Sequence, residues 1–199
     1  NDDLIKRQIA FTKNLISKID EEIEDIDHVF TVGTLHGLVA SAIHPIESRY
    51  GYKKSRELLC SHLRQDDSAL LDAFKKITEG LRILASEYIS AGLDGVYYAA
   101  LGGEKYYFTD DEFKKYIEPF DKEIMKTVKD CNGYSMLHIC KDKLNLNRYA
   151  GYNDYSDIIN WGVYEGGVSL KTGREIFSDV AIMGGLKNRS GVLVEGSIK

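Results

Sequence analysis

The sequence is poor in proline, tryptophan and cysteine. Among its 199 residues only two are proline, one is tryptophan and three are cysteine. The cysteines (Cys60, Cys131 and Cys140) are too few, and odd in number, for a disulfide framework, so a reducing, cytoplasmic setting is expected. No apolar run approaches the roughly 18 residues of a membrane span, and the opening Asn-Asp-Asp is unlike a secretory leader.

An excess of charge of one sign is also missing. Lysine and arginine number 26 against 31 acidic residues, which gives a net charge of −5 and a pI of about 5.6. This balance gives no reason to expect nucleic acid or an anionic membrane as a partner. A Walker loop and the motifs GxGxxG, GxSxG and HExxH are absent too, so nucleotide binding and serine hydrolysis have no support.

The length and apolar content are sufficient for one folded domain, residues 1–199. Hydrophobic residues make up 43% of the chain, enough to bury a sizeable core. The sequence lacks an initiator methionine and ends in Gly-Ser-Ile-Lys, from which we expect a domain truncated at both termini.

Apolar residues at helical spacing predict several helices. The first covers residues 4–26, and a second helical stretch, from about 53 to 91, is broken near 65–68. Thr109 and Glu112 form a capping box that starts a helix running to about Val128, with a kink expected at Pro119. Residues 35–46 predict a loop and a short helix that closes at Pro45, and a further short helix is expected over 170–177.

Five compact apolar runs predict strands, at 28–34, 96–100, 134–140, 158–161 and 180–183. Continuous apolar strands that alternate with helices are typical of a parallel sheet in an α/β fold. Two architectures fit this pattern. A doubly wound, flavodoxin-like sheet of five strands would be complete at this length, whereas a (β/α)8 barrel takes about 250 residues and would be present only in part. Periodicity does not separate the two.

Several segments, in order along the chain, resemble the uroporphyrinogen decarboxylase superfamily. These segments are Ala-Gly-Leu-Asp-Gly-Val-Tyr-Tyr at 91–98, Phe-Lys-Lys-Tyr-Ile-Glu-Pro-Phe at 113–120, Leu-His-Ile-Cys at 137–140, Asp-Ile-Ile-Asn-Trp at 157–161 and Ile-Met-Gly-Gly-Leu at 182–186. The resemblance runs from about residue 29 to 197. It implies a partial TIM barrel, holding roughly the third to seventh of eight parallel strands with flanking helices. Because an open barrel leaves unpaired edges, self-association or a complementary fragment is expected.

His138 and Cys140 are the strongest candidates for chemistry. Residues two apart on a strand share a face, and at the carboxyl end of a barrel strand that face lines the mouth. Imidazole and thiolate are both favoured zinc ligands. Zinc-dependent cobalamin methyltransferases of the superfamily use a His-X-Cys pair here with a later cysteine, which would fall beyond Lys199. Lys141 stands where the family usually has glycine, so the loop after Cys140 is expected to differ in geometry from that of the family.

This resemblance implies that zinc would activate a thiol for attack on a corrinoid-bound methyl group, as in methylcobalamin. A corrinoid-binding protein or a small thiol substrate is then the expected partner. Porphyrinogen decarboxylation is not supported, because the positions of its tyrosine and serine hold Ala40 and Leu101. The alternative is a non-catalytic or truncated domain of the same fold that only binds a small ligand or a partner.

Three further residues are expected to contact substrate: His36, Tyr98 and Asn160. His36 follows the first strand, where it would line the mouth or cap a loop. Asn160 would hold a substrate amide or a neighbouring loop, since a buried asparagine needs hydrogen-bond partners. Tyr98 belongs to an aromatic-rich region around a glycine pair, in which one or two rings would floor a pocket and the others would pack; its members are Tyr97, Tyr98, Tyr106 and Tyr107.

Overall fold

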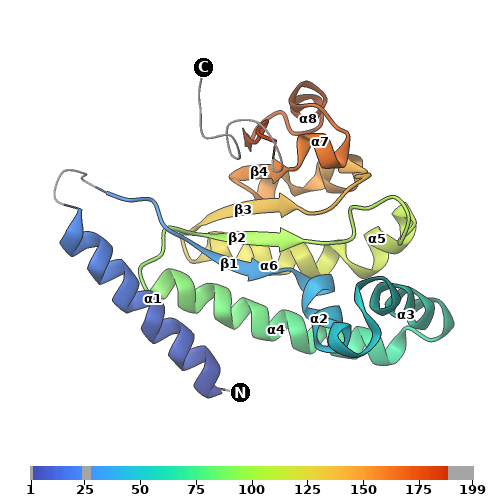
Figure 1. Ribbon diagram of the computed structural model, residues 1–199, viewed down its shortest axis with the longest axis horizontal. Helices are drawn as coiled ribbons and strands as arrows, with labels where there is room; N and C mark the ends of the chain where they lie inside the picture. The colour runs from blue at the N-terminus through green and yellow to red at the C-terminus, as the bar shows by residue number, and fades with distance from the viewer. Residues whose placement is uncertain (1, 24–27, 188–199) are drawn as a thin grey trace.

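The computed structural model describes residues 2–23 and 28–187, and its centre is a parallel sheet of five strands in the order β1-β2-β3-β4-β5 (Figure 1). The strands are β1 (Val32–His36), β2 (Gly95–Ala100), β3 (Tyr134–Ile139), β4 (Ile158–Trp161) and β5 (Ala181–Met183). Each strand lies beside its neighbours in sequence. A flavodoxin-like sheet reverses its strand order at a switch point, so this topology is that of a partial barrel.

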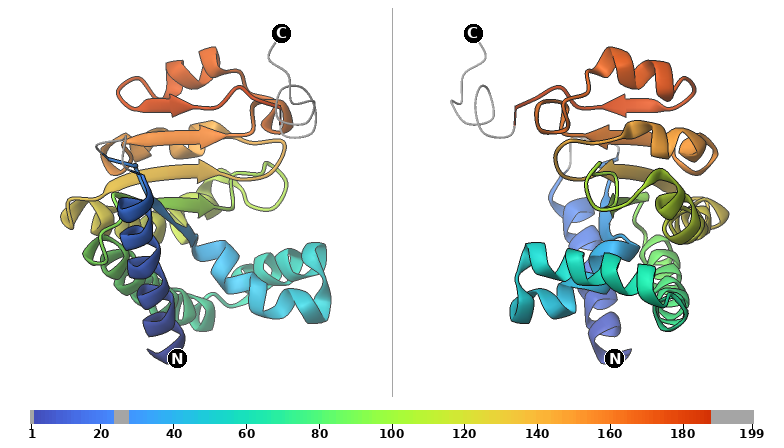
Figure 2. Two further views of the ribbon diagram at one scale, coloured as in Figure 1. Left: turned by 60° about the vertical axis from the view of Figure 1, so that its left-hand side comes forward. Right: turned by 90° about the vertical axis from the view of Figure 1, so that its right-hand side faces the viewer.

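Helices precede and connect the strands. They are α1 (Asp2–Glu22), α2 (Leu38–Tyr50), α3 (Tyr52–Gln65), α4 (Ser68–Ser90), α5 (Asp110–Tyr116), α6 (Glu118–Asp130), α7 (Val163–Gly166) and α8 (Leu170–Ile176), with a 3-10 segment, η1 (Leu146–Tyr155). Figures 1 and 2 show α4 and α6 beneath the strands, α1 alongside α4, and the α2–α3 pair beyond the carboxyl end of β1.

Burial alternates along the strands and identifies two different faces. On β2, Val96, Tyr98 and Ala100 are each at most 1% exposed and pack against the helices, whereas Tyr97 between them is only partly buried. On β3 the same alternation leaves His138 half-buried. Because successive strand residues point to opposite faces, the sheet has one helix-covered face and one face on which the described residues place no helix. We call the second the open face; it corresponds to the inside of a barrel.

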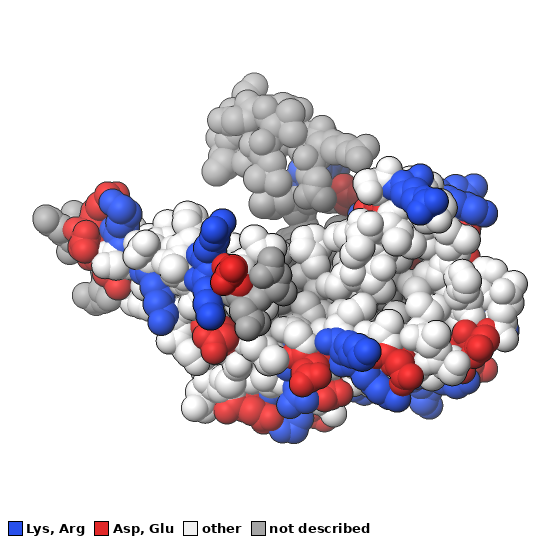
Figure 3. Space-filling model, turned by 90° about the horizontal axis from the view of Figure 1, so that it is seen from below, with Lys and Arg blue, Asp and Glu red and all other residues white. Residues whose placement is uncertain are grey.

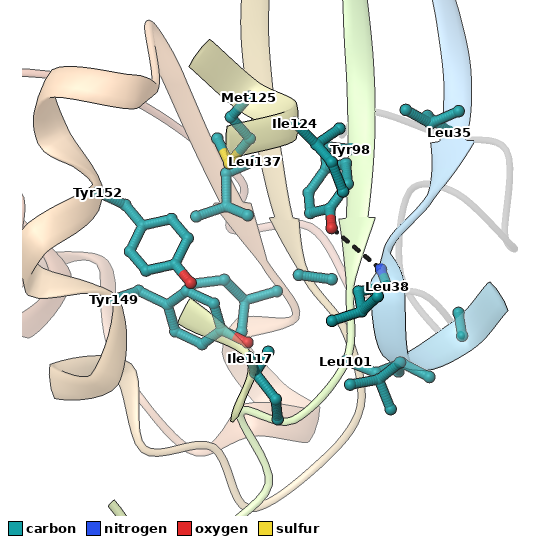
Figure 4. Packing of buried hydrophobic residues seen from close by; sticks show 14 of the residues in the cluster. Leu35, Leu38, Tyr98, Leu101, Ile117, Ile124, Met125, Leu137, Tyr149 and Tyr152 are labelled. Carbon is teal, nitrogen blue, oxygen red and sulfur yellow. Dashed lines mark hydrogen bonds between the residues drawn. The ribbon is translucent and has the colours of Figure 1, made fainter. Parts of the chain in front are cut away.

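The helix-covered face holds the hydrophobic core. Leu35 of β1, Tyr98 of β2 and Leu137 of β3 lie in a row across the sheet, and Ile124 and Met125 of α6 pack against them (Figure 4). All five are at most 2% exposed. At about 25 cal/mol per Å² of apolar surface, burial on this face is the main source of stability.

The region after β1 differs from the expectation. Instead of a loop and a short helix ending at Pro45, α2 runs without a break from Leu38 to Tyr50. Pro45 lies on the exposed side of this helix, and buried Val39 and Ile43 anchor the preceding turns in the core. The strand itself begins at Val32 rather than at residue 28.

The prediction for the helix around Pro119 is also corrected. The predicted kink is a break, because α5 ends at Tyr116 and α6 begins at Glu118, which puts Pro119 in the first turn of α6. Proline is tolerated there, since the first-turn N–H groups have no intrahelical partner. The capping box of Thr109 and Glu112 is confirmed.

The predicted break between the two long helices is confirmed: α3 ends at Gln65 and α4 begins at Ser68. Asp66, between them, accepts hydrogen bonds from the backbone and hydroxyl of Ser68. The predicted end of the first helix, at residue 26, lies outside the described residues.

Charges of both signs are interspersed on the surface seen in Figure 3. Many of them are paired, as in Arg82 with Glu123 and Lys115 with Asp67. Within the described ranges, no helix combines the length and apolarity that crossing a bilayer requires.

Candidate functional site

Three polar side chains form a connected group on the open face: Tyr97 of β2, His138 of β3 and Asn160 of β4. The strand register pairs Ala99 with His138 and His138 with Asn160, so the last two stand side by side on neighbouring strands. This level is near the carboxyl ends of the strands, where barrel enzymes carry their reactive groups.

The imidazole of His138 is held from two directions. Its ring stacks on Tyr97, with centroids 5.2 Å apart and planes 20° from parallel. Its Nδ1 lies 2.6 Å from Oδ1 of Asn160. Burial lowers the pKa of His138 below 6.5, and Lys141 adds to this, while the hydrogen bond with Asn160 opposes it. The imidazole is therefore neutral at neutral pH.

The amide of Asn160 makes hydrogen bonds to three different strands. Its Oδ1 also accepts a hydrogen bond of 3.0 Å from the phenol of Tyr97, and its Nδ2 donates one of 2.7 Å to the backbone carbonyl of Met183 on β5. These contacts match the interpretation that Asn160 binds a neighbouring segment. A direct contact of Asn160 with substrate stays a prediction.

Cys140 comes directly after β3, and its backbone N–H donates to the carbonyl of Ala100. Burial raises the pKa of its thiol to about 11, with Lys141 lowering and Glu104 raising it. A thiolate at Cys140 would in turn add to the rise in the pKa of Tyr97, which burial brings to about 12. The thiol is therefore protonated at neutral pH.

The metal prediction rests on two donors. Among residues 2–23 and 28–187 no cluster of three or more His, Cys, Asp or Glu is arranged to hold a metal ion. Zinc takes four ligands in structural sites and three protein ligands in catalytic ones. His138 and Cys140 as zinc ligands therefore stay a prediction that requires donors from elsewhere.

His36 is the last residue of β1 rather than the first residue after it. Its exposed ring meets the ring of His44 on α2 edge to face, with centroids 4.9 Å apart. Burial lowers the pKa of His44, Glu47 opposes this, and the positive charges of Arg56 and Lys141 lower it further. Sequence spacing does not single out His44, because only the turn from strand to helix brings it back to His36. Substrate binding by His36 stays a prediction.

Tyr98 does not reach the open face, and the expectation for this residue is wrong. Its side chain is 1% exposed on the helix-covered face, where its phenol donates to Asp121. The same oxygen accepts from the backbone N–H of Leu38 (Figure 4). Adjacent strand residues point in opposite directions, so Tyr97 occupies the place on the open face instead.

Tyr106 and Tyr107 lie outside the group. Their rings pack on each other, with centroids 4.7 Å apart, and they border a cleft of about 460 Å³ that Arg64 and Arg148 also line. Glu112 and Asp110 bind these two arginines. The cleft is thus a polar surface feature whose guanidinium charges are already compensated.

Comparison with known proteins identifies a fold. The chain matches no model of a known protein family and no curated protein. Among solved structures it is similar to a methyltransferase from Methanosarcina mazei, with 23% sequence identity and a TM-score of 0.65 over 87% of this chain. The match covers 47% of that methyltransferase, so this chain spans about half its length. Five parallel strands with flanking helices, as part of a barrel-type α/β fold, are common to both.

Proposed function

We propose that this chain is the site-bearing half of a barrel methyltransferase that moves a methyl group from a corrinoid to a small thiol. The observation that carries the proposal is the position of His138: it stands at the carboxyl end of β3 on the open face, with Nδ1 bonded to Asn160 and Cys140 two residues on. The fold likeness to a methyltransferase supports the same reaction class. Zinc and corrinoid enter through the sequence resemblance.

The donor atoms of the site suit zinc. Burial keeps the imidazole of His138 neutral, which is the form that binds a metal. The thiol of Cys140 has a pKa of about 11 and would lose its proton on binding, because a bound cation stabilises the thiolate. When bound, zinc would lower the pKa of a substrate thiol so that the thiol reacts as a nucleophilic thiolate.

The other side chains would position the substrate and limit access of water. Tyr97 covers one face of the His138 ring, and Met136, two residues before His138 on the same face, is only 7% exposed. Lys141, next to Cys140, supplies a positive charge that favours a thiolate at this position. The substrate would approach from the open side of the sheet.

The proposed enzyme needs more polypeptide than these five strands. Large apolar side chains remain exposed on the strands or beside them, with Val32 37%, Met183 43%, Phe30 47% and Tyr134 53% exposed. A parallel sheet normally has both faces covered. A complementary part of the barrel, or a second copy of the chain, would cover the open face and supply the remaining zinc ligands.

Titration with Co²⁺, a spectroscopic substitute for zinc, tests the proposal. The chain with its complementary part should bind about one equivalent and develop a thiolate-to-metal absorption band. His138→Ala and Cys140→Ser should each weaken binding at least tenfold, and Cys140→Ser should also remove the band. Cys131→Ser is the matched control and should leave both unchanged. Binding that survives the His138 and Cys140 substitutions would refute the proposed site.

A half barrel that only binds a small ligand or a partner is the second candidate. The observation in its favour is that no cluster of three or more potential metal donors occurs among the described residues. It predicts no metal uptake by the assembled protein, while ligand or partner binding would persist in the Cys140→Ser variant.

A further inference from the structure

The orientation of the Asn160 side-chain amide determines which ring nitrogen of His138 carries the proton. The Asn160 amide has an oxygen that accepts hydrogen bonds and a nitrogen that donates them. The backbone carbonyl of Met183 accepts only, so the group 2.7 Å from it must be Nδ2. Oδ1 therefore faces the other way, toward β3 and β2.

This orientation decides which nitrogen of His138 carries the proton. Nδ1 lies 2.6 Å from Oδ1 of Asn160, an atom without a hydrogen to donate. A hydrogen bond at this distance requires the proton on Nδ1. In a neutral imidazole with its proton on Nδ1, Nε2 carries a free lone pair.

Tyr97 reinforces the arrangement from β2. Its phenol donates a second hydrogen bond, of 3.0 Å, to the same Oδ1. A flipped amide would lose the contact with Met183 and present N–H groups to His138. The stacked ring of Tyr97 also restricts rotation of the imidazole. Residues of four neighbouring strands, β2 to β5, thus hold the Asn160 amide and the His138 ring in this orientation. Met183 contributes from β5, where it is the register partner of Asn160.

We infer that Asn160 is a positioning residue, which locks His138 in the Nδ1–H tautomer and leaves Nε2 as the atom that binds a metal or accepts a proton. Histidines that ligate metals commonly donate their other N–H to an acceptor, and loss of that acceptor typically lowers metal affinity 10–100-fold. The use of Nε2 as a ligand rests on the proposed function, whereas the tautomer does not.

Nitrogen-15 NMR of the imidazole side chains tests the tautomer directly, because protonated and unprotonated ring nitrogens resonate far apart. In the metal-free chain at neutral pH, His138 should show a protonated Nδ1 and an unprotonated Nε2. Exposed His62 provides an internal reference. A wild-type His138 protonated mainly at Nε2 would overturn the inference without any variant.

Substitutions at Asn160 separate positioning from support of the fold. Asn160→Ala removes the acceptor and should give a mixture of tautomers, whereas Asn160→Asp keeps an acceptor and should keep Nδ1 protonated. Tyr97→Phe leaves the Met183 contact and should not change the tautomer. Asn147→Ala, at an exposed asparagine in η1, is the matched control. Unchanged Nδ1–H occupancy in a folded Asn160→Ala variant would contradict the inference.

A metal measurement distinguishes this inference from the proposed function. If both hold, Asn160→Ala should weaken Co²⁺ binding about 10–100-fold and Asn160→Asp should restore most of it. Failure of the wild-type protein to bind Co²⁺ would reject the metal site and leave the tautomer result standing. Equal Co²⁺ affinity in the wild type and Asn160→Ala would reject the positioning role alone.

Discussion

The phenol of Tyr98 donates a hydrogen bond to the carboxyl group of Asp121 and so ties strand β2 to helix α6. The same oxygen accepts from the backbone N–H of Leu38, the first residue of α2. Asp121 is 1% exposed, and burial raises its pKa to about 7, against the lowering effect of its hydrogen bonds. One buried polar contact therefore connects the core to the helix that follows β1.

The first prediction is a stability that falls as pH rises. The pKa of Asp121 is about 7 in the folded chain and near 3.9 when unfolded, so the native state holds an extra proton between these values. The contribution of this group to the unfolding free energy should decline from about pH 4 to pH 7, on the order of 1.4 kcal/mol per unit of pKa difference. Urea unfolding at several pH values measures it.

Asp121→Asn is the matched control for this pH dependence. It keeps an oxygen that accepts the hydrogen bond from Tyr98 but does not titrate. The decline over this range should be smaller in the variant, and parallel curves for the two proteins would show that Asp121 is not its source.

The second prediction compares two adjacent tyrosines. Tyr98→Phe leaves the buried N–H of Leu38 without its partner and removes one of the two phenol donors to the carboxyl group of Asp121. It should reduce the unfolding free energy by about 1–3 kcal/mol. Tyr97→Phe removes a hydroxyl on the open face, where water can replace it, and should cost less. Urea unfolding at pH 6 compares them. A larger loss for Tyr97→Phe would mean that the two faces are assigned the wrong way round.

The third prediction concerns the cysteines. Burial raises the pKa of Cys60 and of Cys140 to about 11. Because the thiolate is the reactive form, alkylation of Cys140 by iodoacetamide should be slow at pH 7.5 and accelerate up to about tenfold per pH unit below pH 11. Mass spectrometry of digested protein follows each cysteine separately. Rapid alkylation of Cys140 at pH 7.5 would indicate a thiol far more acidic than its surroundings imply.

The fourth prediction is association through the open face. The isolated chain should form dimers or larger species in light scattering, because exposed apolar side chains remain on a sheet face without helices. Met183→Lys and Val32→Lys should shift the distribution toward monomer. Ile83→Lys, at an exposed apolar position on α4, is the control and should have a smaller effect. A wild-type monomer at high concentration would argue against an uncovered face.

Several features of this protein were determined by the sequence alone, because they depend on neighbours in the chain. Compact apolar runs predicted five strands, apolar residues at helical spacing predicted the helices between them, and Thr109 with Glu112 placed a helix start correctly. The Pro119 region was recognised as interrupted, although propensity did not distinguish a kink from a break. The placement of His138 near the carboxyl end of a strand also followed from local pattern.

The tertiary structure decided which side of each strand is covered and which strands are neighbours. Because side chains alternate along a strand, the sequence alone implies that Tyr97 and Tyr98 face opposite sides of the sheet. Only the packing of α6 shows that Tyr98 is the buried one. Strand order, which separates a partial barrel from a doubly wound sheet, depends on contacts between residues far apart in sequence. The link from His138 through Asn160 to Met183 arises in the same way, since it requires three strands in register.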